Sequence, residues 1–548
     1  MRRTHGLRSS PLALVLAGLS GCGTGDREQG STSDVPQRGG TLVIAGPNDL
    51  TGMNAFTASE AYTQDLNLHA LFLPLVSLSA DGEFEPALAE SWEWKGDTAI
   101  VFRLHRDVRW NDGEPTTAGD VVFTFERVIE PTTAFPSASD FNRWHTIEAI
   151  DSFTVRATLQ PHLDPLLSWA FLPIMPEHLL DSIPPGRMRN AEFNHRPVGN
   201  GPFRFVEYRA NDRWVFERNP DFPESLGGPP RIDRLIWRTI PENVAQVTEL
   251  MTAAVDLILI PRAEDLDRLA AEPGVRTIVK PSGQYHFLGW NGRREPLGDT
   301  RVRRALALAI DRPEILRVLR GGRGQLAVGP IPPFHWGYPD SIPPLPWDTM
   351  EAKRLLDQAG LVDRTGDGVR DRKDGRPLSI ALEIPAGNAF GSDVAQMVQA
   401  DLAAVGIRLE VRTVEVTTLI SHIGSRAKNF DAVFLGFDAD YRANVRDLFH
   451  SSAIGGEYQL SSYHNADVDA IIDSLDMVTE RADAIPLLHR LQRIIRDDEP
   501  LTFLWYVPNL YAARDRVRNM EMDERGAFIN LAEWWLADGA ATAKAASR

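Results

Sequence analysis

Two carboxylates, Asp438 and Asp440, follow directly after a continuous apolar run in the C-terminal half of the chain. The run, Ala432 to Phe437, has the sequence AVFLGF, which is typical of a strand covered on both faces. In open α/β sheets, ligands bind in the crevice outside the carboxyl ends of the strands, so we expect a ligand-binding residue in this loop. The alternative is that both aspartates are solvated loop acids or cap a helix.

A second acidic segment has the spacing of a calcium loop, with acidic positions and a central glycine where such a loop needs them. Against calcium, position eight of the loop, normally apolar, is Arg370, and the following GRPLSIALEI predicts a strand and not a helix. A polar hairpin turn is therefore the favoured interpretation, and calcium is the alternative. The calcium ligands would be Asp363, Thr365, Asp367, Asp371 and Asp374.

Motifs that would indicate catalysis or a bound cofactor are absent from the sequence. There is no GxSxG, no P-loop and no glycine-rich dinucleotide fingerprint, and the 13 histidines include no HExxH or His-x-His spacing. The 13 tryptophans could line a sugar cleft, but several lie in strand-like patterns where core packing is the commoner use. These absences disfavour an enzyme without excluding one, and no cofactor is expected. A hydrolase with unrecognised paired acids is the alternative from another class.

The N-terminus has the pattern of a cleavable secretory segment, with three arginines in the first eight residues and a short apolar run from Pro11 to Leu19. The tetrapeptide Leu19-Ser20-Gly21-Cys22 resembles a bacterial lipobox, and Cys22 is the only cysteine in the chain. We expect residues 1–21 to be a lipoprotein signal peptide and residues 22–38 to be a flexible tether. The lipidated Cys22 would then hold the protein on a bacterial membrane, in the periplasm or at the cell surface. An ordinary signal peptide with a chance cysteine is the alternative.

Composition limits the partners. The chain of 548 residues has 58 basic and 75 acidic side chains, a formal net charge of −17, which disfavours nucleic acid as a partner. Hydrophobic residues make up 43% of the chain, enough for several domain-sized cores. No second apolar run of membrane-spanning length follows the N-terminal one.

Local patterns predict mixed α and β elements. Val101, Arg103 and His105 alternate with Phe102, Leu104 and Arg106 as in a half-buried strand, and Asp112-Gly113 favours a tight hairpin turn. Thr117 and Asp120 have capping-box spacing before a helical pattern. Other predicted strands are 39–46, 153–159, two in 198–222, 407–411 and 432–437, and other predicted helices are 62–76, 299–316, 394–405, ended by Gly406, and 418–426.

Several blocks together resemble one family. LAESWEW, followed by FRLHRDVRWNDGEPTTAGDVVFTFERV, resembles the most recognisable block of the extracellular solute-binding proteins that serve ABC importers of dipeptides, oligopeptides and nickel complexes. VGNGPFRFVEYRANDRWVFERNPDF, DTRVRRALALAIDRPEIL and GPIPP are also similar to this family. These blocks span 88–128, 198–222, 299–316 and 329–333.

The resemblance implies a two-lobed α/β fold of the periplasmic-binding-protein type II, with an extra subdomain and a ligand cleft between the lobes. The first lobe would combine residues 39–85, 198–282 and 501–538. Residues 86–197 would form the added subdomain, and residues 283–500 the second lobe.

The resemblance also implies site residues, because Gly436 to Tyr441 matches the end of a strand that binds peptides in the family. By that likeness, Asp440 would accept the peptide's α-ammonium, and Gly436, Phe437 and Asp438 would offer main-chain hydrogen bonds in a strand-addition mode. The implied function is capture of di- or oligopeptides by a monomer that delivers them to an ABC permease and ATPase complex. Nickel chelates, oligosaccharides or another small solute are the alternative ligands.

Overall fold

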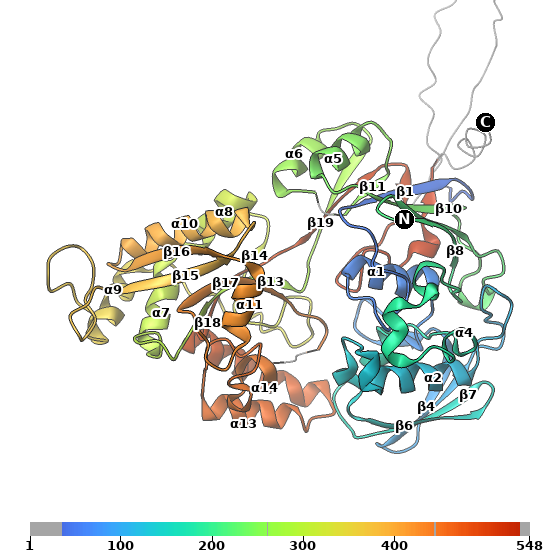
Figure 1. Cartoon of the computed structure of the whole chain (residues 1–548), viewed down its shortest axis with the longest axis horizontal. Coiled ribbons are helices and arrows are strands. Elements are labelled where there is room, and N and C mark those ends of the chain that lie inside the picture. Colours follow the sequence, from blue (N-terminus) through green and yellow to red (C-terminus); the bar gives the residue numbers. More distant parts are fainter. Residues whose placement is uncertain (1–34, 260, 443–444, 538–548) are drawn as a thin grey trace, which may run out of the picture. The chain divides into compact units, whose positions relative to one another are not determined.

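The computed structural model describes residues 35–259, 261–442 and 445–537 and contains two large sheets (Figure 1). The seven-stranded sheet has the order β12-β19-β11-β1-β10-β9-β8. Strand β1 pairs in parallel with β10 and β11, and the other pairs are antiparallel. Its strands are β1 (Thr41–Gly46), β8 (Phe203–Arg209), β9 (Arg213–Arg218), β10 (Arg234–Thr239), β11 (Leu257–Ile258), β12 (Val275–Lys280) and β19 (Asn509–Arg514).

The six-stranded sheet has the order β14-β18-β13-β17-β15-β16. Successive residues of β17 join different apolar cores: Ala432 and Phe434 belong to one, and Val433 belongs to the other. This part of the strand is covered on both faces as predicted, whereas Gly436 and Asp438 are exposed. The strands are β13 (Gln284–Trp290), β14 (Gln325–Leu326), β15 (Ser379–Pro385), β16 (Arg408–Val414), β17 (Ala432–Asp438) and β18 (Leu501–Tyr506).

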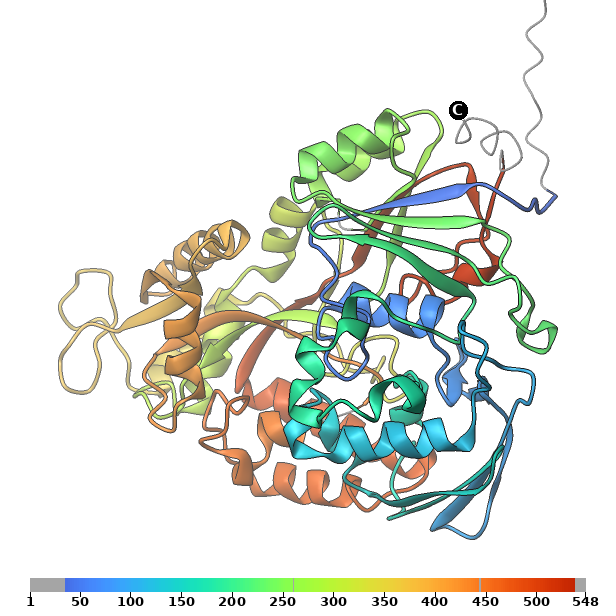
Figure 2. The same ribbon diagram turned by 45° about the vertical axis from the view of Figure 1, so that its right-hand side comes forward.

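A four-stranded antiparallel sheet, β4-β5-β7-β6, carries helix α2 on one face (Figures 1 and 2). The predicted capping box is confirmed: the Thr117 hydroxyl accepts the Gly119 N–H at 3.2 Å, and Asp120 accepts the Thr117 N–H at 2.8 Å. The elements are β4 (Ala89–Trp94), β5 (Ala99–Leu104), β6 (Trp144–Asp151), β7 (Thr154–Leu159) and α2 (Ala118–Ile129).

The predicted hairpin at Asp112-Gly113 is a turn without a full second strand. Gly113 has a φ of +100° and donates to the Trp110 carbonyl at 2.8 Å, as the dipeptide predicts. The only strand-like pairing across the turn, among the described residues, is a single bridge between Arg109 and Pro115. Helix α2 begins immediately afterwards, which leaves no length for a longer ladder.

Two predicted helices are each divided in the structure. The helix expected over 62–76 is α1 followed by a short π-helix, η1 (Asn67–Leu71). The helix expected over 299–316 is divided because Asp311 leaves the helical conformation and caps α8, accepting the Glu314 N–H at 3.0 Å. The helices are α1 (Ala61–Leu66), α3 (Leu167–Ala170), α4 (Glu177–Leu180), α5 (Asn243–Met251), α6 (Leu266–Ala270), α7 (Thr300–Ala309), α8 (Arg312–Arg320), α9 (Thr349–Gln358), α10 (Ala389–Ala403), α11 (Val416–Gly424), α12 (Arg446–Phe449), α13 (Ala466–Leu475) and α14 (Arg481–Asp498). Two small pairs complete the strands: β2 (Val76–Leu78) with β3 (Phe84–Pro86), and β20 (Val517–Arg518) with β21 (Trp535–Leu536).

The fold is two-lobed, and the chain passes between its two large sheets at residues 281–283 and again at 507–508. Strand β12 continues into β13 at the first crossing, and β18 continues into β19 at the second. Because β18 pairs with β13 and β14 in the six-stranded sheet, we propose that the second lobe extends to Tyr506, beyond the boundary at residue 500 expected from the sequence.

Candidate functional site

The loop that carries Asp438 and Asp440 lies against one of the two crossings between the lobes. The Ala439 N–H donates to the Gly283 carbonyl at 3.0 Å, and a side chain at Gly283 would collide with Ala439, because its Cβ would lie 1.6 Å from the Ala439 carbonyl oxygen. The crossings are also bonded to each other, because the Val507 N–H donates to the Gln284 carbonyl at 2.7 Å. The candidate site is therefore built directly beside the connection between the lobes.

Asp440 is held by Arg442. One carboxylate oxygen of Asp440 accepts the Arg442 N–H at 2.7 Å, and the other lies 3.1 Å from the Arg442 Nε. The same guanidinium also bonds Asp140, in the 3₁₀ turn η3 (Ala138–Phe141). Asp440 thus closes its own loop, as expected if it is a loop acid with no ligand. Its carboxylate is also half-exposed beside the lobe crossing.

Asp438 differs from Asp440 in its surroundings. Among the described residues, which omit 443 and 444, its carboxylate has no hydrogen-bond or ion-pair partner. Although Asp438 is partly exposed, desolvation by the surrounding cavity walls, and next the nearby charge of Asp440, raise the pKa of Asp438. A carboxylate in this position would be stabilised by a ligand cation.

Both aspartates line two cavities. One, of about 420 Å³, has walls from α1, η1, η3, the loop after β17 and the turn at residues 523–527. The other, of about 480 Å³, includes Tyr285, His335 and Phe437. These volumes are in the usual range for small-ligand sites, and the cavities share Asp438, Asp440 and Arg442.

The carboxyl end of β17 has an edge without a strand partner. Strand β15 pairs with β17 only at Ala432 and Val433. Since Ala439 bonds Gly283 on the β13 side, the alternation of an antiparallel ladder directs the main-chain groups of Gly436 and Asp438 toward the opposite edge. Within the described residues, this end of the strand is available for an added extended segment.

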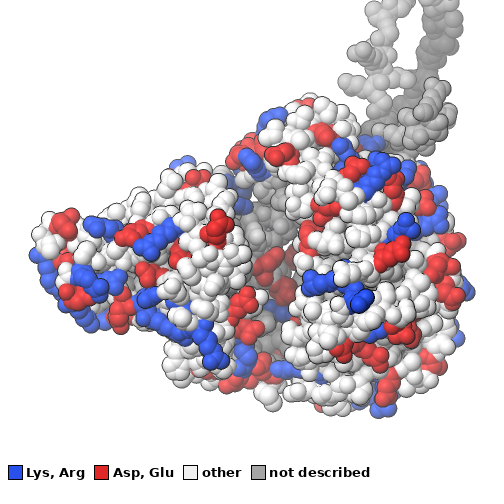
Figure 3. All heavy atoms as spheres, in the orientation of Figure 1, with Lys and Arg blue, Asp and Glu red and all other residues white. Residues whose placement is uncertain are grey.

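Among the charged side chains of the cavity beside α1, carboxylates outnumber guanidinium groups six to two, and Figure 3 shows acidic side chains in the hollow between the lobes. Asp65 is almost fully buried, and its pKa is raised to about 7, first by burial and further by Glu60 and Asp523. Burial raises the pKa of Asp140, and burial together with Asp523 raises the pKa of Glu524. The site therefore has excess negative charge.

A family model described as bacterial extracellular solute-binding proteins, family 5, middle, matches residues 83–453. The chain belongs to this family. Its members are classed as binding proteins and not as enzymes, and the two-lobed fold agrees with that membership.

Relatives of this family-5 protein span nearly its whole length. It is 28% identical over 532 residues to the oligopeptide-binding protein AppA of Bacillus subtilis, covering 96% of this chain and 97% of that protein. It is 27% identical to di/tripeptide-binding protein 2 of Pseudomonas aeruginosa, covering 89% and 93%. The structure of the Bacillus subtilis AppA in complex with a nonapeptide superposes with a TM-score of 0.76 at 27% identity, covering 92% of this chain and 100% of that one.

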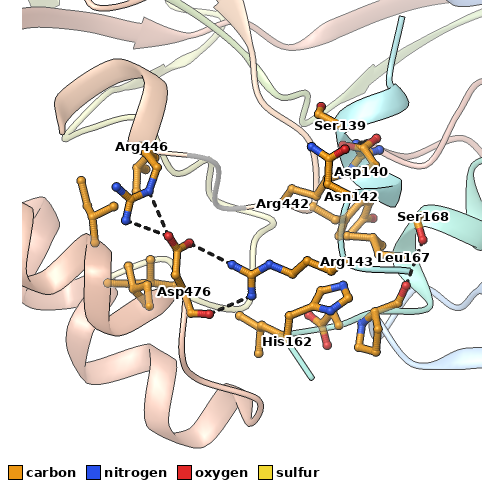
Figure 4. A pocket seen from close by; sticks show the side chains of 18 of the residues that line it. Ser139, Asp140, Asn142, Arg143, His162, Leu167, Ser168, Arg442, Arg446 and Asp476 are labelled. Atoms are coloured by element: carbon orange, nitrogen blue, oxygen red, sulfur yellow. Dashed lines mark hydrogen bonds and ion pairs between the residues drawn. The ribbon is translucent and has the colours of Figure 1, made fainter. Parts of the chain in front are cut away.

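A third cavity of this family-5 protein, of about 360 Å³, contains an arginine cluster (Figure 4). Arg143, just before β6, donates to the Asp476 carbonyl at 2.8 Å and lies 3.5 Å from its carboxylate. Arg446 bonds the same carboxylate at 2.9 Å and Asp473 at 2.6 Å. Figure 4 shows Arg143 and Arg446 converging on Asp476 from different elements, so this cluster joins the start of β6 to α12 and the end of α13.

The acidic loop at residues 363–374 closes on itself. Asp363 accepts the N–H groups of Gly366 at 2.6 Å and Gly368 at 2.9 Å, and Asp371 accepts the Arg364 N–H at 2.7 Å. In the described part of the chain, no group of three or more His, Cys, Asp or Glu side chains is placed to hold a metal ion. The bonds are those of a polar turn, and calcium stays a prediction.

Cys22, the predicted lipidation site, lies outside the described residues. Over the segments that are described, no helix has the length and apolar character needed to cross a membrane.

Sequence reasoning missed the residues that face the aspartate loop from other segments: Asp65, Asp140, Asp523, Glu524 and Arg525. They lie between 83 and 375 positions from Asp440 along the chain, and no motif joins them to it. Arg442, two residues from Asp440, was the one partner that local spacing could have indicated, because a cation beside an acidic loop predicts an ion pair.

Proposed function

We propose that this protein captures peptides between its two lobes and delivers them to an ABC permease and ATPase complex. The observation that carries the proposal is the unpaired end of β17 beside two carboxylates in one cleft. An extended peptide needs main-chain partners along its length and an anion for its α-ammonium, and this arrangement supplies both.

In this proposal the peptide adds to the free edge of β17, where Gly436 and Asp438 offer main-chain groups and Phe437 borders the cavity. Asp440 receives the ammonium. Main-chain hydrogen bonds do not depend on side-chain identity, so such a site accepts many sequences when its side-chain pockets are roomy. The charged end then fixes the register, because an unpaired buried ammonium costs about 2 to 5 kcal/mol.

The relatives support the same ligand class. Two curated relatives at 28% and 27% identity are named as oligopeptide-binding and di/tripeptide-binding proteins, and the structure of the first holds a nonapeptide. Each of them is covered over more than nine-tenths of its length by this chain.

The protein would bind its ligand without catalysing a reaction. The protein would act as a monomer that closes on its ligand, since a ligand with higher affinity for the closed form shifts the open-to-closed equilibrium. Lipidation of Cys22 would keep it at the outer surface of a bacterial membrane, close to the permease. The ligand leaves unaltered.

Mass spectrometry of ligands released from the purified protein tests the proposal. We expect peptides of mixed sequence with free amino termini. Recovery of a haem, a sugar or a metal chelate in place of peptides would contradict peptide capture; one relative at 25% identity is named heme-binding protein A. Conversion of an added peptide into products would contradict binding without chemistry.

A further inference from the structure

We propose that the cleft selects peptides with a basic side chain, and that Asp65 and Glu524 on the first lobe receive that second cation. The inference rests on the proposed peptide binding and specifies its ligand. It goes beyond the role of Asp440, because a single ammonium would need only one acidic partner.

The charge of the cavity wall is the first argument. The cavity of about 420 Å³ has six carboxylates, Asp65, Asp140, Asp438, Asp440, Asp523 and Glu524, and two guanidinium groups, Arg442 and Arg525. Lysine does not occur in its lining. Clefts lined by one sign of charge concentrate ligands of the opposite sign.

The two arginines are already engaged. Arg525 bonds Asp523 through Nε at 3.1 Å and Nη2 at 2.6 Å. Arg442 divides its guanidinium between Asp140 and Asp440. Internal ion pairs thus involve three of the six carboxylates and leave Asp65, Asp438 and Glu524 without an arginine or lysine partner in the described part of the chain.

Asp65 is only partly satisfied by the protein. One of its oxygens accepts the Ala527 N–H at 2.7 Å, and the other is buried and makes no hydrogen bond to any described residue. His69 lies 3.5 Å away but supplies no charge at neutral pH, because burial lowers the pKa of His69 to about 4. A buried carboxylate oxygen without a donor is costly, and a ligand cation would remove that cost.

A second unpartnered group borders the same cavity. Asn67 is 1% exposed, and within the described residues neither its amide nitrogen nor its amide oxygen has a hydrogen-bond partner. Buried polar side chains are nearly always bonded, so an amide left free beside Asp65 indicates that a ligand supplies polar atoms here.

The pKa shifts of the acidic groups agree with their proximity in the cavity. Burial comes first in raising the pKa of both Asp65 and Glu524, and the charge of Asp523 raises both further. A cation placed among these groups would favour their ionised forms. Since no described group of acids is arranged to hold a metal ion, the ammonium of lysine or the guanidinium of arginine, on a long side chain, is the cation that fits.

Calorimetry with matched peptides tests the inference on the wild-type protein. The probes are peptides of three to nine residues, prepared in sets of three that differ only by lysine, alanine or glutamate at one internal position. We expect the lysine member to bind about tenfold tighter than the alanine member, and the glutamate member to bind weakest. Raising NaCl from about 50 to about 500 mM should reduce this ratio by screening.

Glu524→Gln and Asp65→Asn should each reduce the ratio of lysine-peptide to alanine-peptide affinity to less than about threefold. Glu264→Gln, which removes a carboxylate that is 74% exposed and outside the cavity, is the matched control. Equal affinity for all three members would overturn the inference and leave peptide binding intact. Failure of every peptide to bind would overturn the proposed function and the inference with it.

Discussion

At the scale of single residues, the Asp440 carboxylate has two roles. It accepts the Arg442 N–H in its own loop, and in the proposed complex it binds an ammonium. For Asp440→Ala we expect a loss of about 2 kcal/mol in peptide binding, about thirtyfold in affinity, because the ammonium would be left without its anion. Calorimetry with one well-bound peptide measures this.

Asp440→Asn separates these two roles. An asparagine oxygen can still accept the Arg442 N–H, so the loop is retained while the charge is removed. The asparagine variant should therefore also bind weakly. Wild-type affinity in Asp440→Asn would mean that the loop, and not the charge, matters to the ligand.

Asp65 should lower stability at neutral pH. Its pKa is about 7 in the folded protein and about 4 in an unfolded chain, so the folded state binds the extra proton between these values. The stability contributed by this carboxyl is full below about pH 4, falls as the pH rises to about 7, and is constant above that. Asp65→Asn should then be more stable than wild type by about 4 kcal/mol above pH 7.

Denaturant unfolding of both proteins at matched pH values between about 4 and 8 measures the difference in their free energies of unfolding. Taking this difference removes the contributions of the many other carboxylates, because both proteins share them. The gain of the variant should grow over this range. A difference that stays constant, or that shrinks toward pH 8, would contradict a raised pKa at Asp65. A gain in stability accompanied by weaker binding of lysine peptides would show that the acid is kept for the ligand.

At the scale of elements, the contact between Gly283 and the end of β17 fixes the aspartate loop to the lobe crossing. Gly283→Ala should destabilise the protein by about 2 kcal/mol and weaken peptide binding, because the new Cβ would overlap the Ala439 carbonyl and move the loop. Gly186→Ala is the control, since its Cβ would meet only ordinary contacts at 3.6 Å or more. Thermal unfolding and calorimetry of both variants decide; a neutral Gly283→Ala would refute the contact.

Elements with local signals were predictable. The capping box of α2, the stop at Gly406 with φ of +85° and the apolar run of β17 each depend on residues within a few positions of one another, and each is confirmed. The apolar stripe from Val302 to Ile310 is confirmed in α7, but the helix does not continue through 316, because a side-chain cap at Asp311 starts a second helix. Periodicity alone does not register such a local hydrogen bond.

Only the part of the candidate site that lies in one continuous segment was predictable. A strand followed by two aspartates predicted the candidate edge of the sheet, since that expectation follows from the sheet alone. The opposing wall could not be found, because Asp65 and Glu524 approach Asp440 only after the chain has crossed twice between the sheets. Likewise, nothing local pairs Arg143 with Asp476, which lies 333 residues away.

At the scale of the whole molecule, contacts far from the crossings also join α14 to chain segments that precede the first crossing. Arg481, at the start of α14, donates through Nε to both Asp164 oxygens at 3.0 Å and through Nη2 to the Gly82 carbonyl at 2.7 Å. Its guanidinium also lies 5.5 Å from the Trp336 ring centre. Because Asp164 is mostly buried, this pair is screened less than a surface pair.

These bonds form only when the lobes approach, so they should favour a closed arrangement whether or not a ligand is bound. Arg481→Ala is expected to shift unliganded protein toward an open form, seen as a larger radius of gyration in X-ray scattering, and to weaken peptide binding by about threefold to tenfold. Saturating peptide should restore the wild-type dimensions, because ligand and ion pair act on the same equilibrium. Arg490→Ala is the control: this residue is on the same helix, is 57% exposed and contacts Asp467 in its own lobe. Identical scattering from Arg481→Ala and wild type without ligand would contradict this prediction. A bond that stabilises the closed form must shift the equilibrium between open and closed forms when it is removed.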